Sequence, residues 1–457
     1  MGRDLSRRGF IRSTGILGLG ALGAAGLAAC GGSEAPAAPA AEATAPQGEA
    51  PAAAGLPPAD LSVWIWYPDP LVWINPVAEA FTDANPEVKV VAEAPADYWT
   101  KLQTALAGGA GPDVYFMNSV NYWSWISKGT LPDISSYVDA DEVTQDFIAN
   151  GAPAAIDFYK FEGKWYGLPV MYGTTVLYYN EDYIKEMGLT LPADMEDDFD
   201  WIQWREYANT LTQREGDSTT MWGVSTQEGI QSGWLNFVRG NGGDFLNAEA
   251  TKCIIDEPPS VEAWQLLTDM LLEDKVSPSS EALQAEGTRS MFMTGKVAML
   301  PGGSWVMNTL NEQLTDFTYN IAILPKSPNT GERGGTSNIV GIVMNRDGKA
   351  KDQAWGLMSA LVSKDSQDRL AQGGGEGPVV RMDSSEQYYG DPAIGPSNRA
   401  AAVRMGEWTT PLPTHRTVTW GEMMDPTTEW QTEISEGRVS VQEGLTNMAA
   451  AVNDLFG

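Results

Sequence analysis

From Leu61 onward, apolar and polar residues alternate in short blocks whose period changes between two and about 3.6 residues. A period of two predicts a strand, and a period near 3.6 predicts a helix with one buried face. Proline, glycine and asparagine separate the blocks, as expected at turns. The elements predicted first are strands at 61–66, 88–91 and 113–117 and helices at 76–84 and 98–106, the second helix capped by Asp97. This β-α-β-α-β order is typical of an α/β fold with parallel strands.

The same alternation continues through the rest of the chain. Further helices are predicted at 201–213, 260–274, 288–294, 351–362 and 441–455. With 457 residues the chain is long enough for two lobes, each with its own core. In open parallel sheets, ligands bind at the carboxyl ends of the strands, where the connecting loops meet. We therefore expect functional residues directly after the predicted strands.

The first sixty residues have the composition of an export signal followed by a tether. Two arginines follow Ser6, and a Gly- and Ala-rich apolar run extends from Ile16 to Ala29. Residues 1–29 resemble a twin-arginine signal peptide. The sequence that ends at Cys30 resembles the lipobox of bacterial lipoproteins, in which the cysteine is acylated. Residues 30–59 are rich in Ala and Pro, which predicts a flexible tether.

Composition excludes several classes of function. The formal net charge is -31, so the chain would repel nucleic-acid backbones. There is one histidine, His415, and there are two cysteines, Cys30 and Cys253. Zinc sites draw on His and Cys, and serine or cysteine hydrolases need a histidine base. We expect no metal, no cofactor and no catalytic residue, and with Cys30 acylated we expect Cys253 to be a small buried residue.

Several ordered motifs resemble one known family, the extracellular solute-binding proteins of family 1, which includes maltose- and multiple-sugar-binding proteins. The resemblance covers most of 61–381 and is weakest after Met382. The motifs that carry it are Phe81 to Val90, Leu106 to Val114, Tyr166 to Pro169, Leu177 to Asn180, Phe292 to Met299, Gly302 to Trp305, Ile323 to Pro325 and Gly375 to Pro378.

The resemblance implies a type II periplasmic-binding-protein clamshell with a discontinuous first lobe and a hinge between the lobes. Lobe 1 is expected to comprise 60–170 and 299–338, and lobe 2 171–298 and 339–457. It also implies that the protein captures a small carbohydrate and delivers it to the permease of an ABC importer. We expect an exported monomer, anchored through Cys30 to the outer face of the cytoplasmic membrane, in the periplasm or at the cell surface.

Two other functions stay open at this point. The same fold could bind a polyamine, a polyol phosphate or a peptide. A phosphate would need basic residues in the cleft, and among the candidate segments only Arg239 offers one. A secreted carbohydrate-active enzyme would also have aromatic residues beside carboxylates. No paired-carboxylate motif is recognisable in the sequence.

Ten residues are candidates for the ligand site. A sugar presents apolar faces that aromatic rings cover and hydroxyl groups that polar side chains bind. Aromatic and polar residues of this kind lie at strand ends and at the expected crossings between lobes. The candidates are Trp66, Tyr67, Asn118, Ser119, Tyr172, Trp234, Asn236, Trp305, Ser337 and Asn338.

Several candidates have a structural alternative. Trp66 lies on a strand that is buried on both faces in a parallel sheet, so it could belong to the core. Asn118 or Ser119 could cap a helix. Tyr172 and Trp305 could pack in the hinge, and Ser337 and Asn338 could belong to a turn. Trp234 is included because the matching segment of maltose-type relatives contributes an aromatic residue that stacks on the sugar.

Overall fold

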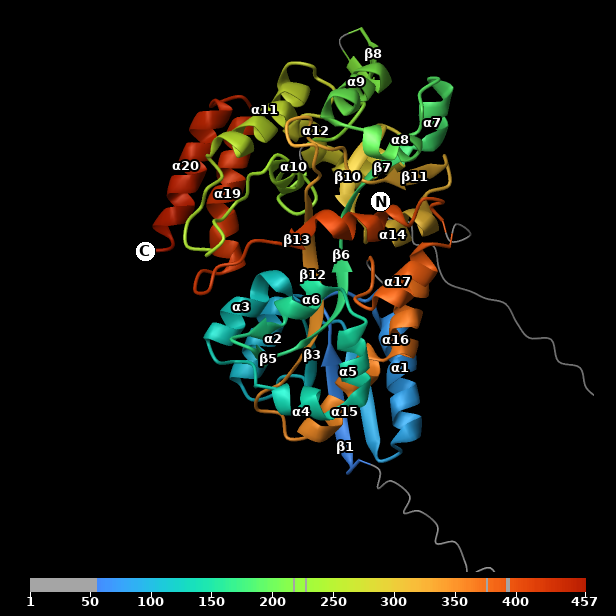
Figure 1. The fold of residues 1–457 in the computed structure, drawn as a ribbon, viewed down its shortest axis with the longest axis vertical. Helices are drawn as coiled ribbons and strands as arrows, with labels where there is room; N and C mark the ends of the chain where they lie inside the picture. The colour runs from blue at the N-terminus through green and yellow to red at the C-terminus, as the bar shows by residue number, and fades with distance from the viewer. Residues whose placement is uncertain (1–55, 217, 227, 375–376, 392–394) are drawn as a thin grey trace, which may run out of the picture. The chain divides into compact units, whose positions relative to one another are not determined.

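The fold is built on two β-sheets, each covered by helices, which we call the first and second lobes. The computed structural model describes residues 56–216, 218–226, 228–374, 377–391 and 395–457. The predicted signal peptide 1–29 and Cys30 lie outside this part of the chain. Figure 1 shows the first lobe around β1, β3 and β12 and the second around β7, β10 and β11.

The first sheet is mixed, and its strands run in the order β13-β12-β3-β1-β2, with β6 also paired to β12. β1 is parallel to β2 and β3, as the β-α-β-α-β pattern predicted. β12 runs antiparallel to β3 and β6. The strands are β1 (Ala59–Trp64), β2 (Val88–Glu93), β3 (Val114–Asn118), β6 (Leu168–Gly173), β12 (Gly335–Met344) and β13 (Thr409–Pro411).

Helices from two distant parts of the chain cover the first sheet. α15 contacts β1, β6 and β12, and it also packs against α1 and α5. A hairpin of β4 (Lys160–Phe161) and β5 (Lys164–Trp165) joins this lobe. The helices are α1 (Leu71–Ala84), α2 (Tyr98–Ala107), α3 (Ser119–Ser127), α4 (Ser135–Ala140), α5 (Glu142–Ala149), α6 (Pro153–Phe158), α15 (Lys351–Val362), α16 (Lys364–Arg369), the π-helix η2 (Leu370–Gly374) and α17 (Met382–Tyr389).

The second sheet is antiparallel and has the order β10-β7-β11. Its strands are β7 (Thr175–Asn180), β10 (Met299–Gly303) and β11 (Tyr319–Ala322), and a separate hairpin joins β8 (Gln213–Glu215) to β9 (Ser218–Met221). Its helices are α7 (Glu181–Glu186), α8 (Pro192–Met195), η1 (Glu196–Asp198), α9 (Trp201–Leu211), α10 (Trp234–Gly240), α11 (Pro258–Leu272), α12 (Ser280–Glu286), α13 (Thr288–Met293), α14 (Val306–Gln313), α18 (Ala401–Arg404), η3 (Met405–Trp408), α19 (Trp420–Ser435) and α20 (Val441–Asp454).

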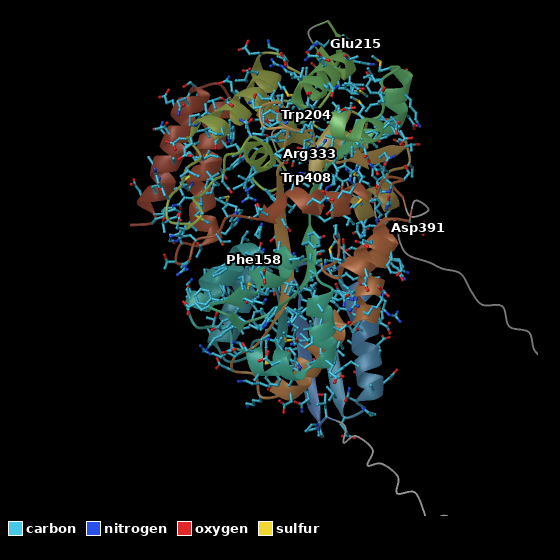
Figure 2. All side chains as sticks on the ribbon, viewed as in Figure 1. Phe158, Trp204, Glu215, Arg333, Asp391 and Trp408 are labelled. Carbon is cyan, nitrogen blue, oxygen red and sulfur yellow. The ribbon has the colours of Figure 1, made fainter. Side chains whose placement is uncertain are left out.

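Three segments connect the lobes. The first is Thr174, which joins β6 to β7. The second is the start of β12, where Gly335 to Ser337 pair with the edge strand β13 before the strand continues alongside β3. The third runs from α17 to α18 and includes Gly395 to Ala400. Near the second crossing, the guanidinium of Arg333 lies over the ring of Trp408, 5.4 Å from its centroid, and both residues are labelled in Figure 2.

The lobe boundaries differ from those that the sequence predicted. Residues 299–338 were assigned to lobe 1, but β10 and β11 both pair with β7 in the second sheet. Residues 339–457 were assigned to lobe 2, but most of β12, α15, α16 and α17 belong to the first lobe. The reason is physical: β12 supplies a strand to the first sheet, and α15 covers that sheet's apolar surface.

The predicted tether also ends earlier than expected. Leu56 packs against the core, and the carbonyl of Pro57 accepts a hydrogen bond from Gln353 Nε2 (2.9 Å). β1 begins at Ala59. Residues 56–59 are therefore part of the first lobe. Among the described residues, no helix has both the length and the apolar composition needed to cross a bilayer.

Candidate functional site

A pocket of about 190 Å³ lies beside the strands that connect the lobes. Both lobes contribute to its wall, because Trp66 follows β1 of the first sheet and Trp305 follows β10 of the second. Three of the ten candidate residues meet here. The lining residues are Trp66, Met171, Gly173, Gln231, Trp305, Asn338 and Val340.

An aromatic cluster holds Trp66 at the first-lobe side of the pocket. Its ring is stacked on Trp99 at 5.7 Å with an interplanar angle of 21°, and it meets the edges of Tyr98 and Phe116. Tyr98 is itself fixed, because its hydroxyl donates to the carbonyl of Phe116 (2.6 Å). Such contacts orient a ring without covering all of it, and Trp66 stays partly exposed. Trp66 therefore packs against the core, as the structural alternative predicted, but it also lines the pocket.

Backbone constraints hold Trp305 at the second-lobe side. The Thr174 N–H donates to Ser304 Oγ (3.1 Å), and the Ser304 N–H donates to the Thr174 carbonyl (2.8 Å). These bonds tie the residue before Trp305 to the first crossing. Gly303 leaves room for the indole, because a Cβ at this position would overlap its six-membered ring. The position of Trp305 therefore depends on both a glycine and a crossing strand.

Asn338 and Gln231 supply the polar groups of the pocket. Asn338 Oδ1 accepts a hydrogen bond from Ser119 Oγ (3.1 Å), which directs the amide. The Gln231 backbone is held in place, since its carbonyl accepts hydrogen bonds from Asn236 Nδ2 (3.0 Å), Thr175 Oγ1 (3.1 Å) and Thr336 Oγ1. Within the described chain, neither the Asn338 amide nitrogen nor the Gln231 side chain has a hydrogen-bond partner. Both side chains can bind hydroxyl groups.

The lining of the pocket is uncharged. None of its seven lining residues carries a charge, although the whole chain has a formal net charge of -31. Arg239, the one basic residue near the candidate segments, is engaged elsewhere. Its Nε lies 3.2 Å from an oxygen of Asp244, and its other nitrogens donate to backbone carbonyls that include Thr410 and Pro411. A ligand in this pocket gains nothing from carrying a net charge.

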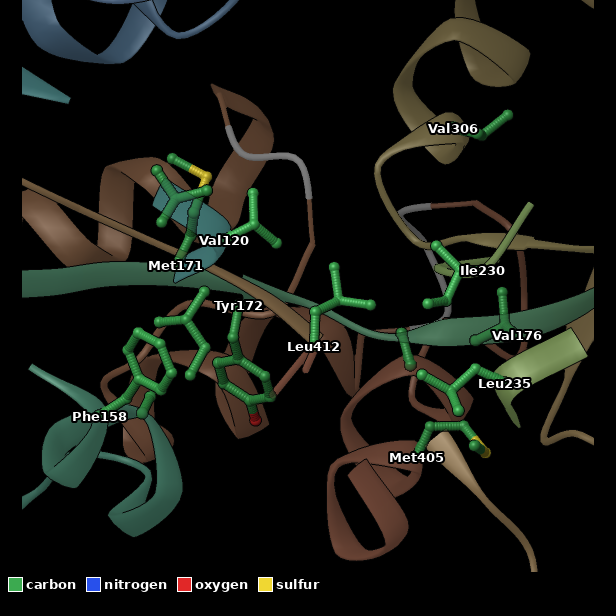
Figure 3. Packing of buried hydrophobic residues seen from close by; sticks show 14 of the residues in the cluster. Val120, Phe158, Met171, Tyr172, Val176, Ile230, Leu235, Val306, Met405 and Leu412 are labelled. Atoms are coloured by element: carbon green, nitrogen blue, oxygen red, sulfur yellow. The ribbon is translucent and has the colours of Figure 1, made fainter. Parts of the chain in front are cut away.

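Tyr172 and Ser337 lie on the opposite face of the same strands. Side chains alternate along a strand, so Met171 and Gly173 face the pocket while Tyr172 faces away (Figure 3). The same alternation on β12 separates Asn338 from Ser337. Tyr172 and Ser337 line a different, larger pocket. Burial raises the pKa of Tyr172 to about 12, so its hydroxyl remains protonated near neutral pH.

Trp234 is a core residue, which corrects the expectation that its ring stacks on a sugar. The side chain is 1% exposed and lies 5.2 Å from Trp264 and 6.0 Å from Phe245, measured between ring centroids. Its Nε1 donates to Gln431 Oε1 (3.2 Å). The side chain extends from α10 to contact Trp264 of α11 and Gln431 of α19. It does not line the pocket.

The remaining candidates support the pocket instead of lining it. Asn236 is 1% exposed, and besides holding Gln231 it accepts a hydrogen bond from the Thr336 N–H (2.8 Å). Tyr67 packs against Trp66 at 5.8 Å. Asn118 is the N-terminal flanking residue of α3, and its Oδ1 accepts from Asn121 Nδ2 (2.9 Å). Ser119 is buried and orients Asn338.

Four lining residues were missing from the sequence prediction: Met171, Gly173, Gln231 and Val340. Gln231 lies in the polar loop before Trp234, so this segment reaches the pocket through Gln231 and not through the predicted Trp234. Met171, Gly173 and Val340 belong to buried strands and have no composition that marks a ligand site. In the described chain, no group of three or more His, Cys, Asp or Glu side chains could hold a metal ion. Cys253 is buried, as predicted.

Known structures share this two-lobed architecture and define the class. An ABC substrate-binding protein from Listeria monocytogenes, solved in complex with cycloalternan, superimposes with a TM-score of 0.75 at 24% identity, over 87% of this chain and 98% of that one. A cyclic α-maltosyl-1,6-maltose binding protein from Arthrobacter globiformis superimposes with a TM-score of 0.73 at 19% identity, over 87% and 99%. The fold is that of the two-lobed solute-binding proteins.

The sequence comparison identifies the family. Residues 76–394 match the family described as bacterial extracellular solute-binding protein, and the chain belongs to it. A lactose-binding protein from Rhizobium radiobacter is 24% identical over 345 residues, which are 72% of this chain and 77% of that protein. The resemblance drawn from the sequence motifs is therefore confirmed.

Proposed function

We propose that this protein captures an uncharged carbohydrate between its two lobes and delivers it to the permease of an ABC importer. The observation that carries the proposal is the meeting of Trp66, Trp305, Asn338 and Gln231 in one uncharged pocket. Two indole rings offer apolar surfaces for the C–H faces of a sugar, and two amides offer donors and acceptors for its hydroxyl groups. The relatives whose names include lactose and arabinooligosaccharides support the same ligand class.

The uncharged lining favours a sugar over the alternative ligands. A polyamine would need carboxylates in the pocket, and a polyol phosphate would need a basic group or a set of free backbone N–H groups. A glycosidase would need two carboxylates on either side of the bond that it cleaves. None of the seven lining residues has an acidic or basic side chain. The pocket therefore fits ligand binding without catalysis.

The volume of the pocket also limits the ligand. About 190 Å³ is less than the roughly 300–1,000 Å³ that is typical of sites for drug-sized molecules. We propose that one sugar ring lies between the indoles, with any further rings extending outside. Closure of the lobes about the connecting strands would then contact the ligand from both sides and be favoured by it.

Isothermal titration of the exported domain, residues 56–457, against neutral mono- and oligosaccharides tests this function. We expect a saturable one-site signal with at least one sugar of the panel. The control titrations use spermidine and glycerol phosphate, which we expect not to compete with the sugar, because the carbohydrate pocket offers no charge to either. A saturable signal with a charged solute and none with any sugar would refute the proposal.

We further propose that the chain is exported by a twin-arginine signal and anchored through an acylated Cys30. Changing Cys30 to Ser in the full-length protein is expected to abolish labelling with a radioactive or alkyne-tagged fatty acid and to release the protein from the membrane fraction. The physical reason is that the sulfur atom of Cys30 is the attachment point of the lipid. As a control, Cys253→Ser should remain labelled. Unchanged labelling of the Cys30 variant would exclude the anchor.

A further inference from the structure

A second pocket, of about 480 Å³, lies on the other face of the connecting strands. Tyr172, Ser337 and Ile339 form its floor, and each is one residue away from a side chain that lines the carbohydrate pocket. Helices of both lobes form its walls. The wall residues include Ala154, Glu386, Val403, Arg404 and Glu407.

The walls of this pocket are mainly small and apolar. The apolar lining includes Ala154 and Ala155 of α6, Ala400 and Val403, so a ligand inside would bury apolar surface against the protein. Tyr172 is the only aromatic ring among the lining residues. The pocket therefore lacks the paired indoles of the carbohydrate site. It suits a compact apolar group better than a sugar ring.

An unpaired hydroxyl lies at the floor. Ser337 is 2% exposed, and its Oγ has no hydrogen-bond partner within the described chain. A buried hydroxyl without a partner costs free energy, and a ligand donor placed there would recover it. The neighbouring Tyr172 hydroxyl has only a weak partner, the sulfur of Met382 at 3.8 Å. The floor thus offers oxygen acceptors to a hydrogen-bond donor.

Carboxylates outnumber cations in the lining of this pocket. Glu386 and Glu407 line it, and neither forms an ion pair with a described residue. Arg404, the only lining cation, pairs with Glu196 at 2.7 Å. Two unpaired carboxylates in a chain of strongly negative net charge attract a cation. They disfavour a ligand that carries a carboxylate or phosphate.

From these observations we infer that the second pocket binds a small organic ammonium ion, with its apolar body between the α6 alanines and Val403 and its N–H groups directed to Ser337 Oγ and the two carboxylates. This site is separate from the carbohydrate pocket and goes beyond the proposed transport function. The ligand is defined by three properties: an apolar body, a single positive charge and N–H donors.

Three probes with the same phenylethyl body separate these properties: phenethylammonium, phenethyl alcohol and 3-phenylpropanoate. Ligand-observed NMR titration of the 56–457 protein, without sugar, measures the dissociation constant of each. We expect phenethylammonium to bind about fivefold more tightly than the alcohol, because exposed carboxylates contribute modestly to binding. The propanoate should bind most weakly. Equal binding of the ammonium and the alcohol, or no binding of the ammonium, would overturn the inference.

Two variants locate the site. Ala154 is exposed on α6 and lines the pocket, so Ala154→Trp should fill the pocket and abolish ammonium binding. Ala450→Trp, at an exposed position of α20, is the matched control and should bind normally. The double variant Glu386→Gln and Glu407→Gln should bind the ammonium and the alcohol equally. If binding survives in Ala154→Trp, or if the double variant keeps the preference for the ammonium, the probe lies elsewhere.

Discussion

Replacing Trp305 with alanine is expected to weaken carbohydrate binding by about 30-fold, which corresponds to about 2 kcal/mol and is typical of a binding hot spot. Trp305 is partly exposed, and its ring forms the second-lobe wall of the pocket. It follows Ser304, which is hydrogen-bonded to Thr174, so its backbone is held against the first connecting segment. Loss of the ring removes the surface on which we propose that the sugar stacks. Isothermal titration with the best sugar of the panel measures the change.

A matched substitution shows whether the loss is local. Trp430→Ala removes a partly exposed tryptophan from α19, which does not line the pocket, and should leave the affinity unchanged. Gly303→Ala keeps the indole but displaces it, because the added Cβ would overlap its ring, and should weaken binding as well. If Trp305→Ala binds as tightly as the parent protein, the carbohydrate does not use this pocket.

Periodicity predicted the local structure of the chain well. The helix predicted at 351–362 is α15 with the same ends, and the one predicted at 98–106 is α2 with one residue more. Other details differ. α1 begins at Leu71 instead of Pro76, so Pro76 lies inside the helix, where it has no N–H to donate to the Val72 carbonyl. Asp97 makes no side-chain capping bond to α2 and has a left-handed backbone conformation.

The assignment of segments to lobes could not be predicted from periodicity, because a strand pattern does not say which sheet the strand joins. β10 and β12 illustrate this. Both are largely buried strands, yet β10 pairs with β7 in the second sheet and β12 with β3 and β6 in the first. Only the pairing of backbone hydrogen bonds between distant segments decides between the two sheets. That information is not local in the sequence.

The candidate site was predicted in part for a related reason. Three candidates from predicted strand ends and crossings, Trp66, Trp305 and Asn338, line one pocket. The face of each strand was not determined, because moving one residue along a strand changes the side on which a side chain lies. Ser337 and Asn338 were both chosen, and the structure separates them onto opposite faces. In the same way the sequence indicated Tyr172, whereas its neighbours Met171 and Gly173 line the pocket.

The core position of Trp234 leads to the second large effect. Trp234→Ala is expected to lower the free energy of unfolding by about 3–5 kcal/mol, because it leaves a cavity beside Trp264 and Phe245. It also removes the hydrogen bond to Gln431. Urea denaturation of the 56–457 protein, compared with Trp430→Ala, measures the change. Replacing the partly exposed Trp430 should lower the free energy of unfolding by a smaller amount.

The two tryptophan substitutions should therefore affect different properties, one the affinity and the other the stability. Trp305→Ala should lose affinity and keep most of its stability, since its ring is partly exposed at the pocket. Trp234→Ala should lose stability and, under conditions in which it remains folded, bind the carbohydrate as tightly as the parent protein. If folded Trp234→Ala instead lost affinity to the same extent as Trp305→Ala, its indole would have to reach the ligand. That would require α10 to move away from α11 and α19 when the ligand binds, because the ring is 1% exposed in this conformation.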